Sequence, residues 1–169
     1  MVIDVIDMTD GSGQYVKEYL ERAGYKHFVE LWGMSGALQV LADRIMTVAP
    51  LFTIKVLRVW GHGSAGSQNI AAGRCAGGSH GSAITLGALN TLADLGKYFA
   101  PGARVELRGC SVADDGGKLI GALAQLWYTR VQAARGAQQG LFEWVGVVEA
   151  RPGFSGLYPV TPVPIERGD

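Results

Sequence analysis

Two side chains that could act together as a nucleophile and its base, His62 and Cys110, each follow a hydrophobic run of the sequence. His62 lies in the stretch WGHGS, and Cys110 lies in the stretch LRGCS, 48 positions further along the chain. A cysteine thiol is only partly ionised at neutral pH, so a nearby imidazole has to take its proton before the sulfur can attack a carbonyl carbon. This pair of residue types therefore indicates acyl transfer through a thiolate.

The elements around the two residues indicate an α/β domain with a mostly parallel sheet. Short β-branched runs alternate with amphipathic segments, which is the pattern of strands joined by helices. Strands are expected at residues 2–8, 27–32, 52–60, 104–108 and 142–150. Ser35 is the expected cap of the second helix, and helices are placed at residues 14–23, 36–49, 86–99 and 115–134. Four of the six prolines fall after residue 150, which predicts an extended tail over residues 151–169.

The expected sheet would bring the two side chains to one edge. His62 comes just after the strand at residues 52–60, and Cys110 comes just after the strand at residues 104–108. Neighbouring parallel strands lie about 5 Å apart, and the binding crevice of an open parallel sheet lies outside their carboxyl ends. We therefore expect a nitrogen of the imidazole within about 7 Å of the Cys110 sulfur.

Glycines accompany both candidate residues. Gly63 follows the histidine and Gly109 precedes the cysteine, and a residue without a Cβ lets the backbone approach a substrate closely. The backbone amides of Gly63 and Cys110 are the expected oxyanion-hole donors, each worth on the order of 3 kcal/mol in an acyl-transfer transition state. The helix expected from Asp115 would add its positive N-terminal end, weakened by the intervening residues 111–114.

The order of these features resembles a known family. Strand, His-Gly, strand and Gly-Cys follow one another as in the caspase-like (clan CD) cysteine peptidases, in which the histidine lies about 50 residues upstream of the cysteine. The stretches IKVLRVWGHGSAGSQNIAAG and ITLGALNTLADLGKYFAPGARVELRGCSVADDGGKLIGALA are most similar to a caspase-like domain of uncharacterised function in large bacterial surface and adhesin-like proteins. The resemblance covers most of the chain, including the N-terminal VIDVIDM and the amphipathic segment after it.

The resemblance implies a caspase-haemoglobinase fold, which is a flavodoxin-like three-layer sandwich with a mostly parallel central sheet, and a dyad at His62 and Cys110. It implies a cysteine endopeptidase that acts on a protein or peptide substrate, or on its own parent chain. No cofactor or metal is expected. The caspase pentapeptide around the nucleophile is replaced by Arg-Gly-Cys-Ser-Val, so cleavage after aspartate does not carry over. The second function class is a catalytically inactive caspase-like interaction domain of a larger bacterial protein, although such a domain would usually have lost one member of the dyad.

Other interpretations of the same residues stay open. Cys110 could be a small buried hydrophobic residue, as many free cysteines are. His80 competes for the role of base, because the stretch SHGS repeats the His-Gly-Ser of residues 62–64 inside a glycine-rich loop. A zinc site would have ligands of suitable types in His62, Cys75, His80 and Cys110. The spacing of these residues matches no compact zinc pattern.

The glycine-rich segment 63–83 is expected to form a mobile active-site loop with a short hairpin around residues 68–72. It lacks the Gly-Lys-Ser/Thr ending of a phosphate-binding loop. Ser64 has no glycine two positions before it, as a serine nucleophile elbow requires. Asp114 and Asp115 are interpreted first as helix-capping residues, with a substrate pocket for a basic side chain or solvated charges as the alternatives.

Length and composition restrict the function further. The chain has 169 residues, 48% of them hydrophobic, which fits one compact domain over the whole length. Lys plus Arg and Asp plus Glu number 15 each, so neither nucleic acid nor an anionic membrane is an expected partner. The acidic start is unlike a signal peptide, and no apolar run approaches the roughly 20 residues of a membrane span. Two cysteines are too few for a disulfide framework, so the expected location is cytoplasmic, or exported without a signal peptide in this chain.

Overall fold

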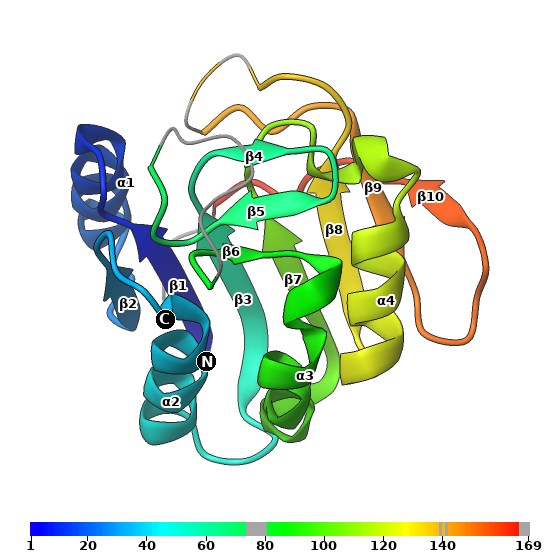
Figure 1. The fold of residues 1–169 in the computed structure, drawn as a ribbon, viewed down its shortest axis with the longest axis horizontal. Helices are drawn as coiled ribbons and strands as arrows, with labels where there is room; N and C mark the ends of the chain where they lie inside the picture. Colours follow the sequence, from blue (N-terminus) through cyan, green and yellow to red (C-terminus); the bar gives the residue numbers. More distant parts are fainter. Residues whose placement is uncertain (74–80, 139, 141, 166–169) are drawn as a thin grey trace.

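Figure 1 shows the fold in a computed structural model, which describes residues 1–73, 81–138, 140 and 142–165. The main sheet contains β1 (Val2–Asp7), β2 (Phe28–Leu31), β3 (Ile54–Trp60), β7 (Phe99–Leu107), β8 (Arg130–Ala134), β9 (Val147–Ala150) and β10 (Leu157–Pro159). The α-helices are α1 (Gly11–Arg22), α2 (Ala37–Val48), α3 (Leu89–Leu92) and α4 (Lys118–Trp127). Three 3-10 segments join them, namely η1 (Leu86–Ala88), η2 (Ala93–Tyr98) and η3 (Val112–Asp115).

The seven strands lie in the order β10-β9-β8-β7-β3-β1-β2. The five strands from β2 to β8 in this order run parallel, and β9 and β10 are each antiparallel to the strand before them. The chain places β2 on one side of β1 and then continues on the other side with β3, so the direction of winding changes between β1 and β3. A ligand crevice opens at such a switch point in open α/β sheets. The expected α/β class with a mostly parallel sheet is confirmed.

One face of the sheet, which we call the apolar face, packs against α2, α3 and α4. Successive residues of a strand point to opposite faces, so a buried face is read from every second residue. On the apolar face these residues join the three helices in one core: Ile3, Val5, Leu57, Val59, Val105, Leu107, Val131, Ala133 and Val148. Figure 1 shows the three helices in front of the sheet.

The opposite face, which we call the charged face, carries a row of buried polar side chains. Asp4, Arg58, Glu106, Gln132 and Glu149 come from five adjacent strands and stand in one continuous register. All five are buried. Arg58 donates to both Asp4 oxygens at 2.7 and 2.8 Å, and Gln132 donates to Glu149 at 2.7 Å. Pairing makes the burial of these groups tolerable, because an unpaired buried charge is costly.

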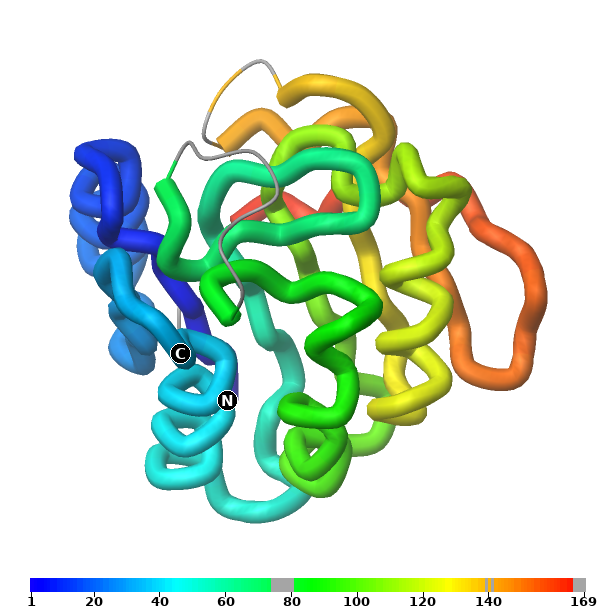
Figure 2. The backbone as a smooth tube through the Cα atoms, in the orientation of Figure 1, coloured from blue at the N-terminus to red at the C-terminus, as the bar shows by residue number. Residues whose placement is uncertain are grey.

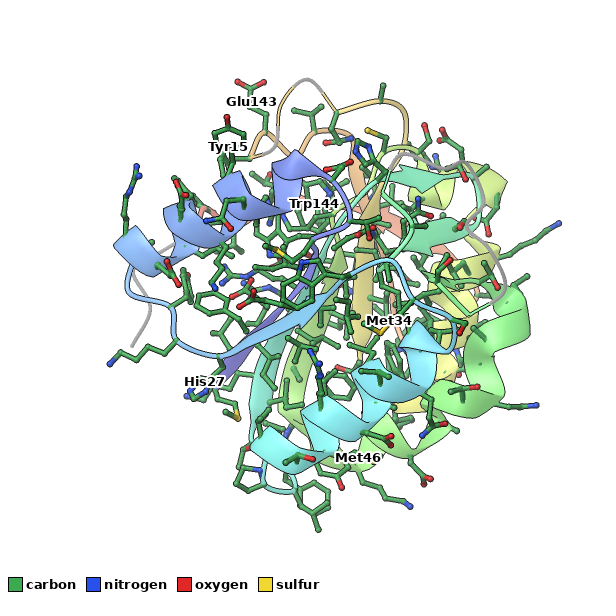
Figure 3. All side chains as sticks on the ribbon, turned by 60° about the vertical axis from the view of Figure 1, so that its left-hand side comes forward. Tyr15, His27, Met34, Met46, Glu143 and Trp144 are labelled. Atoms are coloured by element: carbon green, nitrogen blue, oxygen red, sulfur yellow. The ribbon has the colours of Figure 1, made fainter. Side chains whose placement is uncertain are left out.

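Helix α1 covers the β1 end of the charged face. Val16 and Leu20 of α1 pack on Ile6 and Trp60 of the sheet. Figure 3, in which α1 and α2 come forward, shows the two helices on either side of the sheet. The first turn of α1 therefore lies beside the carboxyl ends of β1 and β3.

A second, three-stranded sheet lies at the carboxyl end of β3, as Figures 1 and 2 show. It consists of β4 (Gly63–Ser64), β5 (Ser67–Asn69) and β6 (Ala83–Ile84). The expected hairpin around residues 68–72 is therefore wrong in position: the chain reverses at Ala65 and Gly66, where Gly66 has a φ of +71°. Residues 67–71 are buried, so this part of the segment is not a loose loop. Cys75 and His80 lie outside the described residues.

Two expected helices differ from the structure. The helix expected at residues 86–99 is a single α-turn between two 3-10 segments. The helix expected at residues 115–134 begins late and ends early, since α4 is followed by β8. Gly116 and Gly117 have φ values of +78° and delay its start, and Tyr128 adopts the left-handed region at +50° and ends it. The chain then alternates between the two faces of the sheet from Arg130 to Ala134.

Smaller differences concern helix caps and the C-terminal segment. Gly36 rather than Ser35 precedes α2, and the Leu38 amide donates to a backbone carbonyl of the neighbouring segment instead of a capping side chain. The last expected strand is shortened to β9, and the tail contributes the edge strand β10. Among the residues that the structure describes, no helix is long and apolar enough to cross a membrane.

Candidate active site

His62 lies two residues beyond β3, at the switch point of the sheet. The parallel register of β1 and β3 pairs Ile6 with Trp60, so the residues after the two strands leave the sheet side by side. Asp10, the N-cap of α1, thereby reaches the imidazole, and its Oδ2 lies 2.9 Å from His62 Nε2. The imidazole is 39% exposed, as a group that meets a substrate should be.

Asp10 is held from its other side by the start of α1. Its Oδ1 accepts hydrogen bonds from the Ser12 backbone N–H at 2.9 Å and from the Ser12 hydroxyl. Burial tends to raise the pKa of Asp10, but the hydrogen bonds from Ser12 and the neighbouring His62 outweigh burial and lower the pKa from 3.8. The carboxylate is therefore ionised at neutral pH.

Cys110 occupies the equivalent position on the next strand. The register of β3 and β7 pairs Val59 with Leu107, and His62 and Cys110 each lie three residues beyond that pair. The Cys110 sulfur is partly buried and accepts a hydrogen bond from the Gln138 backbone N–H at 3.4 Å. Within the described part of the chain, no hydrogen bond joins the sulfur to His62. The expected approach within about 7 Å stays a prediction.

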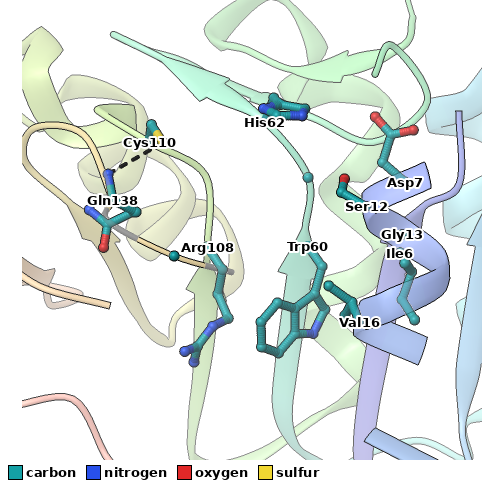
Figure 4. A pocket seen from close by; sticks show the side chains of 12 residues that line it. Ile6, Asp7, Ser12, Gly13, Val16, Trp60, His62, Arg108, Cys110 and Gln138 are labelled. Atoms are coloured by element: carbon teal, nitrogen blue, oxygen red, sulfur yellow. Dashed lines mark hydrogen bonds between the residues drawn. The ribbon is translucent and has the colours of Figure 1, made fainter. Parts of the chain in front are cut away.

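One pocket of about 290 Å³ receives both candidate side chains. It lies on the charged face, between the carboxyl ends of β1, β3 and β7 and the first turns of α1. Figure 4 shows Cys110 and His62 on two sides of its mouth, with Trp60 and Arg108 deeper in the pocket. The lining residues are Ile6, Asp7, Ser12, Gly13, Val16, Trp60, Gly61, His62, Arg108, Cys110, Gln138 and Gly140. The strand-end geometry expected from the sequence thus brings the two residues to one cavity.

A buried glutamine ties the two candidate residues' loops together. Gln68 is fully buried on β5, and its Oε1 accepts the Gly109 N–H at 2.8 Å. Its Nε2 donates to the Asn69 carbonyl at 3.0 Å and lies 3.4 Å from the His62 carbonyl. This side chain therefore fixes the spacing of the loop after β3 and the loop after β7.

The glycines beside the candidate residues bring these two loops into contact. A Cβ at Gly63 would lie 2.7 Å from the Cys110 carbonyl oxygen, and a Cβ at Gly109 would lie 2.9 Å from the Gly63 nitrogen. Their immediate role is thus a close backbone approach between the loops. The expected close approach of a substrate to this backbone stays a prediction. The roles of the Gly63 and Cys110 amides as oxyanion donors stay predictions.

The helix after Cys110 begins later in the chain than expected, which further weakens the expected effect of its dipole on the sulfur. η3 and two glycines separate Cys110 from α4, which begins at Lys118. The dipole effect falls off within the first turn of a helix. Asp115 accepts the amides of Lys118 and Leu119 and so caps α4, as expected, whereas Asp114 accepts the Gly136 amide.

The deep wall of the pocket is a stacked arginine that sequence reasoning did not single out. The Arg108 guanidinium lies 4.4 Å from the ring centroid of Trp60 and 4.5 Å from that of Trp144. Its Nη1 donates to Glu106 at 2.8 Å. Burial lowers the pKa of Arg108, although Glu106 opposes this. Arg108 therefore anchors the pocket to the buried polar row beneath it.

Two further residues near the site, Asp10 and Gln138, were given no role in it from the sequence. The signal for Asp10 was a carboxylate just after the first strand, on the same edge as His62.

In the described part of the chain, no group of three or more His, Cys, Asp or Glu side chains could hold a metal ion. Comparisons of the chain with protein-family models, with curated proteins and with solved structures found no match. The caspase-like resemblance therefore stays a prediction.

Proposed function

We propose that the protein is a cysteine endopeptidase with a caspase-haemoglobinase-like fold, in which Cys110 is the nucleophile and His62 the base. The observation that carries this proposal is that both side chains line one pocket from equivalent positions on adjacent parallel strands. A nucleophile and a base have to share a cavity with a bound substrate before geometry or pKa can matter. The strand order also supports the proposal, since the pocket opens at the switch point beside β1 and β3.

The proposed reaction is acyl transfer in two steps. In the first step, His62 takes the thiol proton of Cys110, and the sulfur forms a bond to the carbonyl carbon of the substrate peptide. The C–N bond then breaks, and the leaving amine receives the proton from His62. In the second step, His62 takes a proton from water and the hydroxide displaces the sulfur from the acyl group. The departing thiolate of Cys110 takes the proton back from His62, which restores the thiol. No redox partner or cofactor enters this balance.

The developing negative charge on the carbonyl oxygen requires donors near Cys110. The proposed donors are the amides of Gly63 and Cys110, because the two loops that carry them are in contact. Among the described residues, no backbone hydrogen bond is formed by the Cys110 amide, and we propose that it donates to the substrate oxygen. Preorganised donors of this kind stabilise the transition state strongly.

The proposed substrate is a protein or peptide, including the parent chain of this domain. The pocket combines apolar walls, such as Val16 and Trp60, with polar groups at its mouth, which suits one amino-acid side chain of a longer chain. The bacterial surface-protein context implied by the resemblance would make self-processing a natural activity. Which side chain the pocket selects is the first question for a substrate library.

A non-catalytic interaction domain is the second candidate function. The observation in its favour is the hydrogen bond that the Cys110 sulfur accepts from Gln138, since a sulfur that binds a backbone amide could serve the structure alone. Under this alternative the pocket would bind a peptide without cleaving it. The two candidates differ in turnover, so they are separated by one assay.

The test is cleavage of a diverse peptide library by the purified protein, read by mass spectrometry. The proposal predicts cleavage by the wild type, none by Cys110→Ala, and unchanged cleavage by the matched variant Cys75→Ala. Because Cys110 lines a pocket, Cys110→Ala should retain most of the wild-type stability in thermal unfolding. Binding of library peptides without any cleavage would support the interaction domain, and unfolding of Cys110→Ala would support a structural cysteine.

A further inference from the structure

The carboxylate of Asp10 lies where it can control the state of the His62 ring. We infer that Asp10 is a positioning residue that extends the His62/Cys110 dyad to a Cys-His-Asp triad. The inference rests on the proposed function and deepens it, because it assigns the proton on each ring nitrogen. It starts from the 2.9 Å contact between Asp10 Oδ2 and His62 Nε2.

Asp10 selects the tautomer of the His62 ring. The Asp10 carboxylate is ionised and can only accept hydrogen bonds, because its pKa lies below 3.8. Nε2 must therefore carry a proton, and the neutral ring has its lone pair on Nδ1. Figure 4 shows the imidazole between Cys110 on one side and Asp7 and Ser12 on the other. Nδ1 is thus the nitrogen that remains for the proton of the Cys110 thiol.

Asp10 also stabilises the positive charge that forms on the His62 ring. When the proton moves from the Cys110 sulfur to Nδ1, the imidazole becomes a cation and Nε2 keeps its own proton. The Asp10 carboxylate stabilises this cation and takes no proton itself, which is the role of the aspartate in serine-protease triads. The side chains of His62 and Asp10 are 39% and 22% exposed, so water screens part of the attraction. We therefore expect a smaller effect than in a fully buried triad.

Helix α1 holds the Asp10 carboxylate in a fixed orientation. The second oxygen of Asp10 accepts both the N–H and the hydroxyl of Ser12, so the carboxylate cannot turn away without uncapping α1. The same helix is fixed to the sheet through Val16, which packs on Trp60. A carboxylate with both oxygens engaged in this way holds a ring orientation, as an acid/base group requires.

Asp10→Asn tests the inference with a small structural change. Asn caps helices as well as Asp does, so α1 should be retained. If the Asn oxygen accepts from Ser12, its NH₂ group faces Nε2 and favours the tautomer whose proton is on Nδ1. That tautomer cannot accept the thiol proton at Nδ1. Alkylation of Cys110 by iodoacetamide at neutral pH should therefore slow by roughly 10- to 100-fold, and the rate should depend differently on pH.

Asp115→Asn is the matched control, because Asp115 also caps a helix and, among the described residues, forms no hydrogen bond or ion pair with His62. It should leave both the rate and its pH dependence unchanged. Slower alkylation in Asp10→Asn but not in Asp115→Asn supports the triad. An unchanged rate and pH profile in folded Asp10→Asn overturns it. If His62→Ala slows alkylation and Asp10→Asn does not, only the triad fails; if neither slows it, the proposed function fails as well.

Nitrogen NMR of the wild type keeps the inference testable if Asp10→Asn does not fold. The ¹⁵N shifts of the His62 ring at neutral pH distinguish a protonated Nε2 from a protonated Nδ1. The triad predicts a proton on Nε2 and none on Nδ1 in the neutral ring. A neutral ring with its proton on Nδ1 contradicts the triad directly.

Discussion

The two faces of the sheet are built by different chemistry. The apolar face meets three helices through hydrophobic side chains, whereas the charged face buries a row of ion pairs and hydrogen bonds across five strands. The candidate pocket lies on the charged face, one row closer to the carboxyl ends of the strands, where Ile6, Trp60 and Arg108 line it. The apolar face thus supplies core burial, and the charged face supplies a defined arrangement beneath the site.

This difference has an energetic meaning. Apolar burial tolerates substitutions of similar volume, because it has no direction. A buried ion pair is sensitive to the loss of either partner, because the hydration that each charge loses on burial is compensated by the charge of the other. The charged face should therefore be more sensitive to the loss of one partner, and the apolar face to the loss of volume.

The largest expected effect on stability comes from breaking the Asp4–Arg58 pair. Asp4→Ala leaves the buried Arg58 guanidinium and the Trp60 indole N–H without their acceptor, which should cost about 3–5 kcal/mol of unfolding free energy. The measurement is urea unfolding. The double variant Asp4→Leu with Arg58→Met should be more stable than Asp4→Ala alone. A single variant within about 0.5 kcal/mol of the wild type would mean that the row is not structural.

On the apolar face, Leu57→Ala should lower the free energy of unfolding by about 2–5 kcal/mol. The substitution removes a buried side chain of β3, the strand between β1 and β7. The same unfolding experiment measures it. Unlike changes near the pocket, it should leave the alkylation rate of Cys110 in the folded protein unchanged. A large change in the alkylation rate of folded Leu57→Ala would show that packing on the apolar face affects the site on the charged face.

Gln68→Leu should have a smaller effect on stability and a specific effect on the site. It leaves the buried Gly109 N–H without its acceptor, which should cost about 1–3 kcal/mol, and it frees the loop that carries Cys110. We expect slower alkylation of Cys110 as well. The control is Gln39→Leu on the exposed surface of α2, which should change neither stability nor alkylation by much. Equal stability and equal alkylation rates in the two variants would show that Gln68 does not fix the loop that carries Cys110.

The smallest effect should be the contribution of Asp10 to stability in acid. Because the pKa of Asp10 is lowered below 3.8 in the folded protein, its contribution is fully present above pH 3.8 and is lost as the pH falls through the folded pKa. The difference in unfolding free energy between wild type and Asp10→Asn should therefore shrink on going from about pH 5 to about pH 3. A difference that grows in acid would mean that the carboxylate is not stabilised in the folded state.

Much of the sheet follows from the sequence, because its strands are marked by strong hydrophobic runs. The run at residues 52–60 already predicted a strand, and its position before His62, like that of the strand before Cys110, placed the two side chains at one edge. The helix expected to run through residue 134 was wrong because apolar residues continue past Tyr128 without a change of composition. Only the left-handed conformation of Tyr128 marks the change from helix to strand.

The missing parts of the candidate site depend on strand order, which periodicity does not reveal. Asp10 meets His62 because β1 and β3 are neighbours, although β2 and α2 separate them along the chain. Gln68 was expected in a short hairpin of a mobile glycine-rich loop, yet its side chain is fully buried and joins two loops of the site. Such contacts join segments far apart in the sequence, so no local pattern predicts them.

Whether His62 activates Cys110 is measured by the rate of Cys110 alkylation at neutral pH. The wild type, His62→Ala, His80→Ala and the surface variant His27→Ala are treated with iodoacetamide in a Cys75→Ala background, so that only one thiol reacts. The account predicts a loss of about tenfold or more in His62→Ala and rates near that of the wild type in the other two. If His80→Ala silences Cys110 while His62→Ala leaves its rate unchanged, His62 is not the base and the account is wrong.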